Sequence, residues 1–177
     1  MEIDYSKHIV DVPNYPKEGV IFKDLTPIWK DPRTLNSLIW DMSKPWVDSG
    51  IDIVASIESR GFIIGSAIAY EIGAGFVPLR KPNKLPRETY FEDFDLEYGS
   101  TSIHVHTDAV EKGKKVLIID DLLATGGTAI AAYNLMMKLQ AQVEGFGFIV
   151  NLDFLKGKEK LQNIVGNTKI DCVVNYD

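Results

Sequence analysis

Apolar residues along this chain alternate between short continuous runs and longer stretches with helical spacing. A short apolar run between turn residues is typical of a strand buried on both faces. Apolar residues three or four positions apart instead predict an amphipathic helix. The predicted strands span residues 51–57, 75–79, 115–120 and 142–152, with a further strand in CVVNY near the C-terminus, and the predicted helices span residues 61–72 and 127–140.

One more helix is predicted from its boundary residues. Asp31 and Pro32 are typical of an N-cap and a first helical position, and apolar residues at helical spacing follow them as far as Met42. Pro45 is expected to end or kink this helix, because proline lacks the backbone N–H that helix continuation requires. Gly73 is expected to end the helix over residues 61–72.

Strands and helices that alternate in this way predict an α/β fold with a mainly parallel sheet covered by helices on both faces. The length of 177 residues suits a single domain over residues 1–177. Ligands bind such sheets at the carboxyl ends of the strands. We therefore expect the chemistry in the loops that follow Ile57, Leu79, Asp120 and Leu152.

The segment RKPNKLPRETYFEDFDLEYGS, residues 80–100, interrupts the alternation. It has two prolines, basic residues followed by acidic ones, and neither a helical nor an alternating apolar period. Long irregular insertions in compact domains are often functional, so this segment is predicted to be a lid. The alternative is a solvated surface hairpin.

Composition and net charge argue against some classes of function. A formal net charge of −6 argues against a broad electrostatic surface for nucleic acid or anionic membrane. The single cysteine, Cys172, fits a reducing compartment. The N-terminus lacks the pattern of a secretory signal, and no apolar run reaches the roughly 18–20 residues of a membrane span. These features predict a cytoplasmic protein that binds neither nucleic acid nor membrane.

The strongest motif is VLIIDDLLATGGTAIAAY, residues 116–133, in which a strand, two acids, a glycine turn and a helix follow one another. Glycines let the backbone approach a ligand, and N–H groups at a helix start favour phosphate. Asp120 and Asp121 would repel a bare polyanion but can accept hydrogen bonds from sugar hydroxyls, directly or through a metal. The motif therefore predicts a ribose 5-phosphate site. It is neither a Walker A loop nor a dinucleotide-binding fingerprint, and the alternative is an acidic strand end with a glycine helix cap.

This motif resembles the phosphoribosyl pyrophosphate signature of the type I phosphoribosyltransferases. The string DDLLATGGT, with SRGF upstream and RK..KLP and LEYG between them, is similar to the adenine phosphoribosyltransferases in that family. The resemblance implies the family's fold, with a small N-terminal base-binding hood over about residues 1–30 and a lid over about residues 80–100. It also implies transfer of a phosphoribosyl group from phosphoribosyl pyrophosphate to adenine, which gives AMP and pyrophosphate.

The resemblance places the 5′-phosphate in the glycine turn. It sets Asp120 and Asp121 near the ribose hydroxyls and near a Mg²⁺ ion held mainly by substrate and water. In the family, the loop after the first strand binds pyrophosphate and contains a non-proline cis peptide, here between Glu58 and Ser59. The implied phosphate ligands are Ala124, Thr125, Gly126, Gly127 and Thr128; the implied pyrophosphate ligands are Glu58, Ser59, Arg60, Arg80, Lys84 and Tyr98, whereas Lys81 alone reads equally well as a surface lysine.

For the base, the resemblance implies main-chain contacts from Ile21 and Lys23, with Phe22 on one ring face and Leu152 on the other. Many relatives have arginine where Lys23 stands, and Phe22 could equally belong to the core. Glu97, in LEYG, matches the carboxylate that exchanges a proton near adenine N7. Asp120, Asp121, Arg60 and Glu97 are thus the implied catalytic residues.

Several alternatives stay open at this stage. The base could be xanthine or orotate, or the domain could be a regulator that senses phosphoribosyl pyrophosphate without catalysis. A receiver domain would need another strand-end aspartate, and SIESRG offers only Glu58. His104 and His106 could share a metal, although an exposed strand face is favoured. The family resemblance also implies a homodimer.

Overall fold

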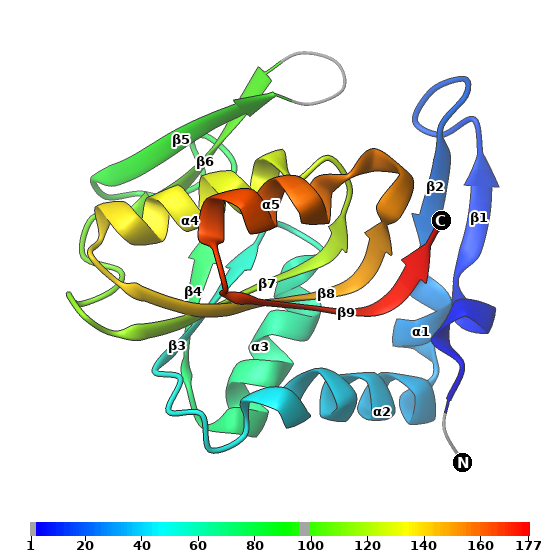
Figure 1. The fold of residues 1–177 in the computed structure, drawn as a ribbon, viewed down its shortest axis with the longest axis horizontal. Helices are drawn as coiled ribbons and strands as arrows, with labels where there is room; N and C mark the ends of the chain where they lie inside the picture. The colour runs from blue at the N-terminus through cyan, green and yellow to red at the C-terminus, as the bar shows by residue number, and fades with distance from the viewer. Residues whose placement is uncertain (1–2, 96–99) are drawn as a thin grey trace.

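The computed structural model describes residues 3–95 and 100–177 and has at its centre a five-stranded sheet in which every strand is parallel (Figure 1). The strand order is β4-β3-β7-β8-β9. This architecture confirms the predicted α/β class. The strands are β3 (Ile53–Ile57), β4 (Gly75–Leu79), β7 (Lys115–Leu123), β8 (Gln142–Leu152) and β9 (Lys169–Tyr176).

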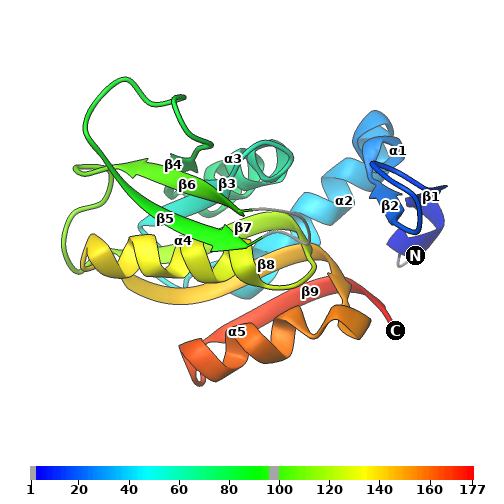
Figure 2. The ribbon, with the colours of Figure 1, turned by 90° about the horizontal axis from the view of Figure 1, so that it is seen from above.

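Helices cover both faces of this sheet (Figures 1 and 2). On one face α4 (Gly127–Lys138) and α5 (Gly157–Val165) pack over one apolar cluster, and on the other α2 (Pro32–Ser43) and α3 (Gly61–Ile72) pack over a second. Alternate residues of β7 enter the two clusters: Ile118 lies in the first and Ile119 in the second, and both are fully buried. Burial on both faces explains why this strand is continuously apolar.

The predicted start of α2 and the predicted end of α3 agree with the hydrogen bonds and backbone conformations at those positions. The Asp31 carboxylate accepts a 2.8 Å hydrogen bond from the Thr34 amide and caps α2, which begins at Pro32. Past Ser43 the chain tightens into the 3-10 turn η2 (Lys44–Trp46), which contains Pro45. Gly73 ends α3 in a left-handed conformation with φ of 72°. The helix α5 was not among the helices predicted from the sequence.

Strand β7 is longer than expected, and this corrects the predicted strand end at Asp120. The strand continues to Leu123 and pairs with β8 beyond the two acids, with Leu122 opposite Val150 and Leu123 opposite Asn151. The apolar side chains of Leu122 and Leu123 still pack in the core, so pairing with β8 persists past the polar positions. Asp120 and Asp121 therefore lie within a paired strand, near its carboxyl end.

Part of the segment 80–100 forms a regular strand, which corrects the expectation that the segment is irregular throughout. Strand β5 (Thr89–Asp95) pairs in antiparallel fashion with β6 (Ser100–His106), and we call these two strands the β5–β6 hairpin. The hairpin packs along α4 partly through polar contacts, since Glu92 forms a 2.5 Å ion pair with Lys138. Because polar residues such as Glu92 occupy packed positions, the alternation of apolar and polar residues that predicts a strand does not show in the sequence.

The N-terminal hood forms a second small sheet. After the 3-10 turn η1 (Tyr5–His8), β1 (Val10–Pro13) pairs in antiparallel fashion with β2 (Ile21–Asp24), and the short helix α1 (Thr26–Lys30) leads into α2. Figures 1 and 2 show this small sheet beyond the carboxyl ends of the central strands, near the C-terminus. Within the described residues, every helix is too short or too polar to cross a membrane.

Candidate active site

A cavity of about 250 Å³ opens at the carboxyl end of β7, where parallel sheets bind ligands. The acid pair forms one part of its wall and the glycine turn, residues 124–128, forms another. The structure thus brings together the two halves of the strongest sequence motif. Its lining residues are Arg60, Asp120, Asp121, Leu122, Leu123, Ala124, Thr125, Gly126, Thr128, Ala129 and Phe148.

The glycine turn passes directly into α4. Gly126 has a φ of 87°, a conformation that glycine adopts without steric cost, and the helix begins at Gly127. No side chain caps this helix N-terminus within the described residues, so its first amides keep their hydrogen-bonding capacity. Uncapped N–H groups and the helix dipole together favour a phosphate in the turn.

The acid pair is largely withdrawn from solvent yet lines the cavity. Asp120 is 9% exposed and Asp121 is 6% exposed. Burial raises the pKa of Asp120 well above its ordinary value, and the neighbouring Asp121 charge raises it further. Burial also raises the pKa of Asp121, although the Arg60 guanidinium opposes that shift. Burial therefore makes both carboxylates costly to ionise without a partner, and the ionised forms gain from a ligand that donates hydrogen bonds or carries positive charge.

One oxygen of this pair is still available to a ligand. Arg60 Nη2 lies 2.7 Å from Asp121 Oδ2, but among the described residues no donor meets that oxygen along a hydrogen-bonding direction. Asp120 Oδ1, by contrast, accepts a 2.9 Å hydrogen bond from the Asp121 amide. A buried carboxylate oxygen without a hydrogen bond, in a cavity wall, suits a sugar hydroxyl or a hydrated divalent cation.

A larger cavity of about 650 Å³ adjoins the first and shares Arg60, both acids and Thr128 with it. Its other walls come from the hood, from the loop after β3 and from the β5–β6 hairpin. The two cavities together span the distance from the glycine turn to the hood. The remaining lining residues are Tyr15, Phe22, Ile57, Glu58, Ser59, Lys81, Phe94, Thr101, Ser102 and Ile103.

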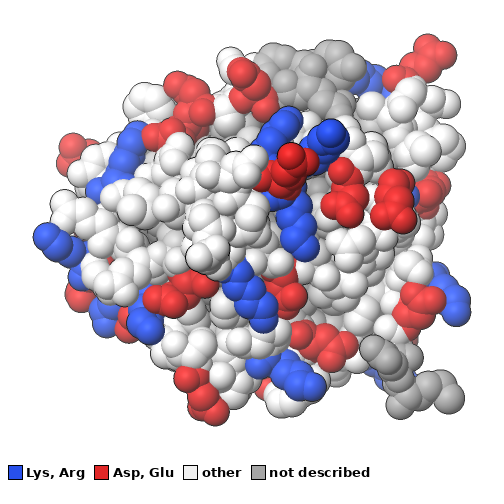
Figure 3. All heavy atoms as spheres, viewed as in Figure 1, with Lys and Arg blue, Asp and Glu red and all other residues white. Residues whose placement is uncertain are grey.

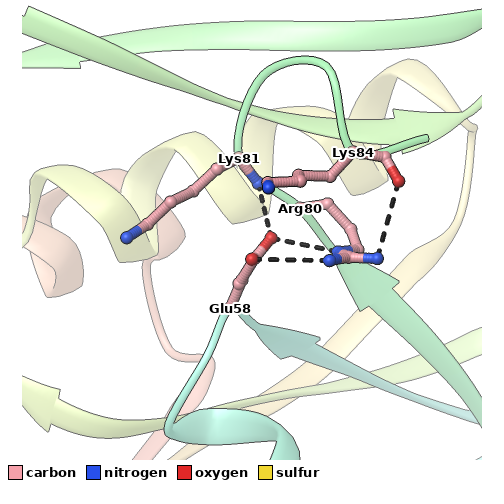
Figure 4. Close-up of polar contacts among 4 residues, drawn as sticks. All are labelled: Glu58, Arg80, Lys81 and Lys84. Atoms are coloured by element: carbon pink, nitrogen blue, oxygen red, sulfur yellow. Dashed lines mark hydrogen bonds and ion pairs between the residues drawn. The ribbon is translucent and has the colours of Figure 1, made fainter.

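The loop after β3 holds the predicted cis peptide between Glu58 and Ser59. Figure 4 shows the Glu58 carboxylate facing Arg80, which donates to it from Nε at 3.0 Å, while the Lys81 amide donates at 2.9 Å. The hydrogen bond from Arg80 lowers the pKa of Glu58. Arg80 also donates from Nη1 to the Lys84 carbonyl at 3.5 Å. The Arg80 guanidinium is therefore engaged with the chain itself, and of these three cations only Lys81 lines the larger cavity.

The hood contributes an aromatic wall. Phe22 lines the larger cavity and meets Tyr15 edge-on, with ring centroids 5.2 Å apart. Arg60 lies 4.7 Å from the Phe22 ring centroid and donates from Nη1 to the Lys23 carbonyl at 3.4 Å. Sequence analysis missed Tyr15. Its place between two prolines, close to the predicted base-binding strand, was the available signal.

Other predicted residues lie elsewhere. Ile21 is 55% exposed, and Leu152 is buried in the core cluster beside α2 and α3; neither lines the two cavities. Glu97 and Tyr98 lie outside the described residues. Gly127 begins α4 beside the hairpin, where a methyl group in place of its hydrogen would lie 3.2 Å from the Asp95 carbonyl oxygen.

His104 lies in the β5–β6 hairpin. Its ring stacks on Phe91 with centroids 5.5 Å apart, and Nε2 lies 2.9 Å from the Ser102 hydroxyl. Within residues 3–95 and 100–177, no group of three or more His, Cys, Asp or Glu side chains is arranged to hold a metal ion. Figure 3 shows acidic and basic side chains interspersed over one face of the molecule.

Comparison with known proteins gave consistent results. The family model described as phosphoribosyl transferase domain matches residues 33–170. The adenine phosphoribosyltransferase of Thermotoga neapolitana is 46% identical over 160 residues, covering 90% of this chain and 94% of the relative. A crystal structure of the enzyme of that name from Thermoanaerobacter pseudethanolicus has a TM-score of 0.91 at 40% identity, covering 98% of both chains. The Giardia lamblia enzyme, crystallised with 9-deazaadenine, has a TM-score of 0.92 at 34% identity and covers 98% of this chain and 97% of its own.

Proposed function

This chain belongs to the phosphoribosyltransferase family, and we propose that it transfers the 5-phosphoribosyl group of phosphoribosyl pyrophosphate to adenine, with AMP and pyrophosphate as products. The observation that carries this function is the uncapped glycine turn beside a buried acid pair, in one cavity wall. The relatives' names and the 9-deazaadenine complex favour adenine over xanthine or orotate. They also favour an enzyme over a sensing regulator.

The phosphoribosyl group lies across the smaller cavity. Its 5′-phosphate accepts hydrogen bonds from the amides of the glycine turn and from the Thr125 and Thr128 hydroxyls. Its ribose hydroxyls donate to Asp120 and Asp121, which line this cavity. Holding the sugar at both ends fixes the anomeric carbon for attack and removes the entropy cost of alignment from the reaction step.

Magnesium fits this arrangement as a cofactor that arrives with the substrate. Asp121, whose Oδ2 accepts no hydrogen bond from the described residues, and its neighbour Asp120 would supply hard oxygen ligands, directly or through water. When bound, Mg²⁺ neutralises charge on the pyrophosphate leaving group. The protein residues near it orient the ribose and hold the carboxylates in place.

Pyrophosphate leaves toward the loop after β3. The amides of Ser59 and Arg60 and the Arg60 side chain bind it there, with Lys81 on the same cavity wall. The Arg60 guanidinium lines both cavities, so its positive charge lies close to the place where negative charge develops on the leaving group. Arg80 and Lys84 lie just behind this wall and add positive charge at longer range.

Adenine lies in the larger cavity against the hood, stacked on Phe22. Its N9 forms the new bond to the anomeric carbon as the bond to pyrophosphate breaks, and Glu97 exchanges a proton at N7 as bonding at N9 changes. The β5–β6 hairpin borders the same cavity through Phe94 and Thr101, which pair near the end of β5 and the start of β6. As a lid, the hairpin excludes water that would otherwise capture the cationic sugar.

We further propose that the enzyme acts as a homodimer in the cytoplasm. Large apolar side chains on α2 and α3 support association, since Trp40 is 52% exposed and Tyr70 is 87% exposed. The lone cysteine supports a reducing compartment. Sedimentation of the purified protein distinguishes a monomer from a dimer.

The test mixes the protein with Mg²⁺, phosphoribosyl pyrophosphate and one base at a time, and identifies products by mass spectrometry. AMP should form from adenine, and the same mixtures with xanthine or orotate should give no nucleotide. Nucleotide from another base in preference to adenine would overturn the assignment. Binding of phosphoribosyl pyrophosphate without turnover of any base would point to the regulator instead. Full activity in Glu97→Gln would reject the proton exchange at N7.

A further inference from the structure

The start of α5 packs backbone to backbone against the glycine turn, about thirty residues away in the sequence. We propose that Gly157 is a positioning residue for the 5′-phosphate site. Its backbone contacts the glycine turn from outside the cavity and so fixes the position of that turn. The inference rests on the proposed function, since it concerns the site that binds the phosphoribosyl group. Gly157 lines neither cavity and lies outside the sequence motifs that identify the site.

The two backbones leave no room for a side chain between them. A methyl group on Gly157 would lie 2.1 Å from the Ala124 carbonyl oxygen and 2.8 Å from the Gly126 nitrogen. A methyl group on Gly126 would in turn lie 2.8 Å from the Gly157 carbonyl oxygen. Such distances are well inside van der Waals contact, and the opposing atoms are backbone, so no rotamer change can relieve the overlap.

The helix is the less movable of the two partners. Leu161 is fully buried and Val165 is 8% exposed, both in the core cluster that α4 also covers. The helix entry is fixed by hydrogen bonds from the Lys156 amide to the Asp153 carbonyl and from the Lys160 amide to the Lys156 carbonyl. Retreat of α5 would uncover Leu161, whereas the turn borders a cavity into which it can move.

A side chain at position 157 therefore shifts the turn rather than the helix. The shift displaces the Gly126 amide, which belongs to the set of N–H groups that receive the phosphate. Small displacements of such groups are costly, because a misplacement of about 1 Å can cost roughly a hundredfold in rate. The hood and the loop after β3 are separate from this contact, so the adenine half of the site stays in place.

The experiment compares Gly157→Ala with Gly145→Ala in the full-length protein. The control substitution is Gly145→Ala, which places a methyl group 2.0 Å from the Trp46 ring. Gly145 lies at the end of β8 that is opposite to the site. Calorimetric titration with ribose 5-phosphate should give a Kd at least about tenfold higher for Gly157→Ala than for the wild type, with a parallel rise in KM for phosphoribosyl pyrophosphate. The KM for adenine should change by less than about twofold. Gly145→Ala should lower the Tm while the Kd for ribose 5-phosphate stays at the wild-type value.

Wild-type affinity for ribose 5-phosphate in a folded Gly157→Ala protein would overturn the role of Gly157 and leave the proposed function intact. A wild-type protein that binds no ribose 5-phosphate would overturn both. If Gly157→Ala does not fold, hydrogen exchange of the wild type decides the matter. Ribose 5-phosphate should then slow exchange of the amides at residues 158–160 as well as in the glycine turn. Protection of the turn alone would reject the contact as a positioning device.

Discussion

The glycine-turn pocket and the hood face each other across one site, yet they are built in different ways. Most of the pocket comes from the end of β7 and the glycine turn that follows it, and β7 lies between β3 and β8 in the middle of the sheet. The hood is a two-stranded sheet whose β1 residues are mostly exposed. Backbone amides and buried carboxylates form the first region, whereas aromatic side chains from separate segments form the second.

The hood meets the rest of the molecule through buried apolar residues that flank its strands, among them Ile9 and Leu25, and through one buried lysine in β2. Lys23 is only 8% exposed; its Nζ lies 2.7 Å from Asp11 Oδ1 in β1 and 3.7 Å from the Tyr176 ring centroid in β9. The lysine thus joins both hood strands to the central sheet. The glycine-turn pocket is thus built within the central sheet, whereas the aromatic wall lies on a small separate sheet that is joined to the core through Lys23 and the residues flanking its strands.

The largest effect is expected from Asp121→Asn in the pocket. Loss of this charge removes a ligand for the ribose hydroxyls and for hydrated Mg²⁺, so kcat/KM for phosphoribosyl pyrophosphate should fall by about 10²-fold or more. Steady-state kinetics measures the loss, and calorimetry should show adenine affinity within about twofold of wild type. An equal loss of adenine affinity would show that the two regions are not separable.

In the hood, Lys23→Met should weaken the binding of adenine and leave the binding of phosphoribosyl pyrophosphate unchanged. Methionine keeps much of the buried volume but removes the cation that joins Asp11 and Tyr176, so the hood should lose its fixed position. We expect the KM for adenine to rise by about tenfold while the KM for phosphoribosyl pyrophosphate stays unchanged. The matched control is Lys112→Met at an exposed position. A rise in both KM values would contradict an effect confined to the hood.

A smaller effect is expected from Tyr15→Leu. The substitution removes the edge-on ring that supports Phe22, and such aromatic pairs contribute about 0.5–1.5 kcal/mol. The KM for adenine should therefore rise by about threefold. Tyr15→Phe retains the ring and should behave as wild type; if it matches Tyr15→Leu instead, the hydroxyl rather than the ring supports the base.

The smallest effect concerns stability. Burial raises the folded-state pKa of Asp120, so the ionised carboxylate weakens the fold as pH rises through that pKa. Asp120→Asn cannot ionise and should raise the Tm by roughly 2–4 °C at pH 7–8 for a gain of about 1 kcal/mol, while activity falls. The gain should vanish near pH 4, around the unfolded-state pKa of aspartate. Thermal unfolding across this range measures it, and a gain independent of pH would reject the electrostatic cause.

The same contrast explains what could be predicted from the sequence. The helix α3 and the strand β8 were predicted with the observed bounds, because Gly73 and the flanking turn residues mark their ends locally. The glycine turn was recognisable because glycines, acids and helix start are adjacent in the chain. Tyr15 and the Lys23–Tyr176 contact were not, because they depend on segments that meet only after folding. The contact between Gly157 and the glycine turn was hidden for the same reason.

The contacts of Arg60 with both halves of the site affect how the two substrates bind. Its guanidinium reaches Asp121 on one side and the Lys23 carbonyl and Phe22 ring on the other. An occupant of either half-site must change the environment of this shared side chain, so the two binding events are thermodynamically coupled. By reciprocity, the factor by which adenine alters the affinity for phosphoribosyl pyrophosphate equals the factor for the reverse. Dissociation constants measured for each substrate alone will therefore not multiply to give the stability of the ternary complex.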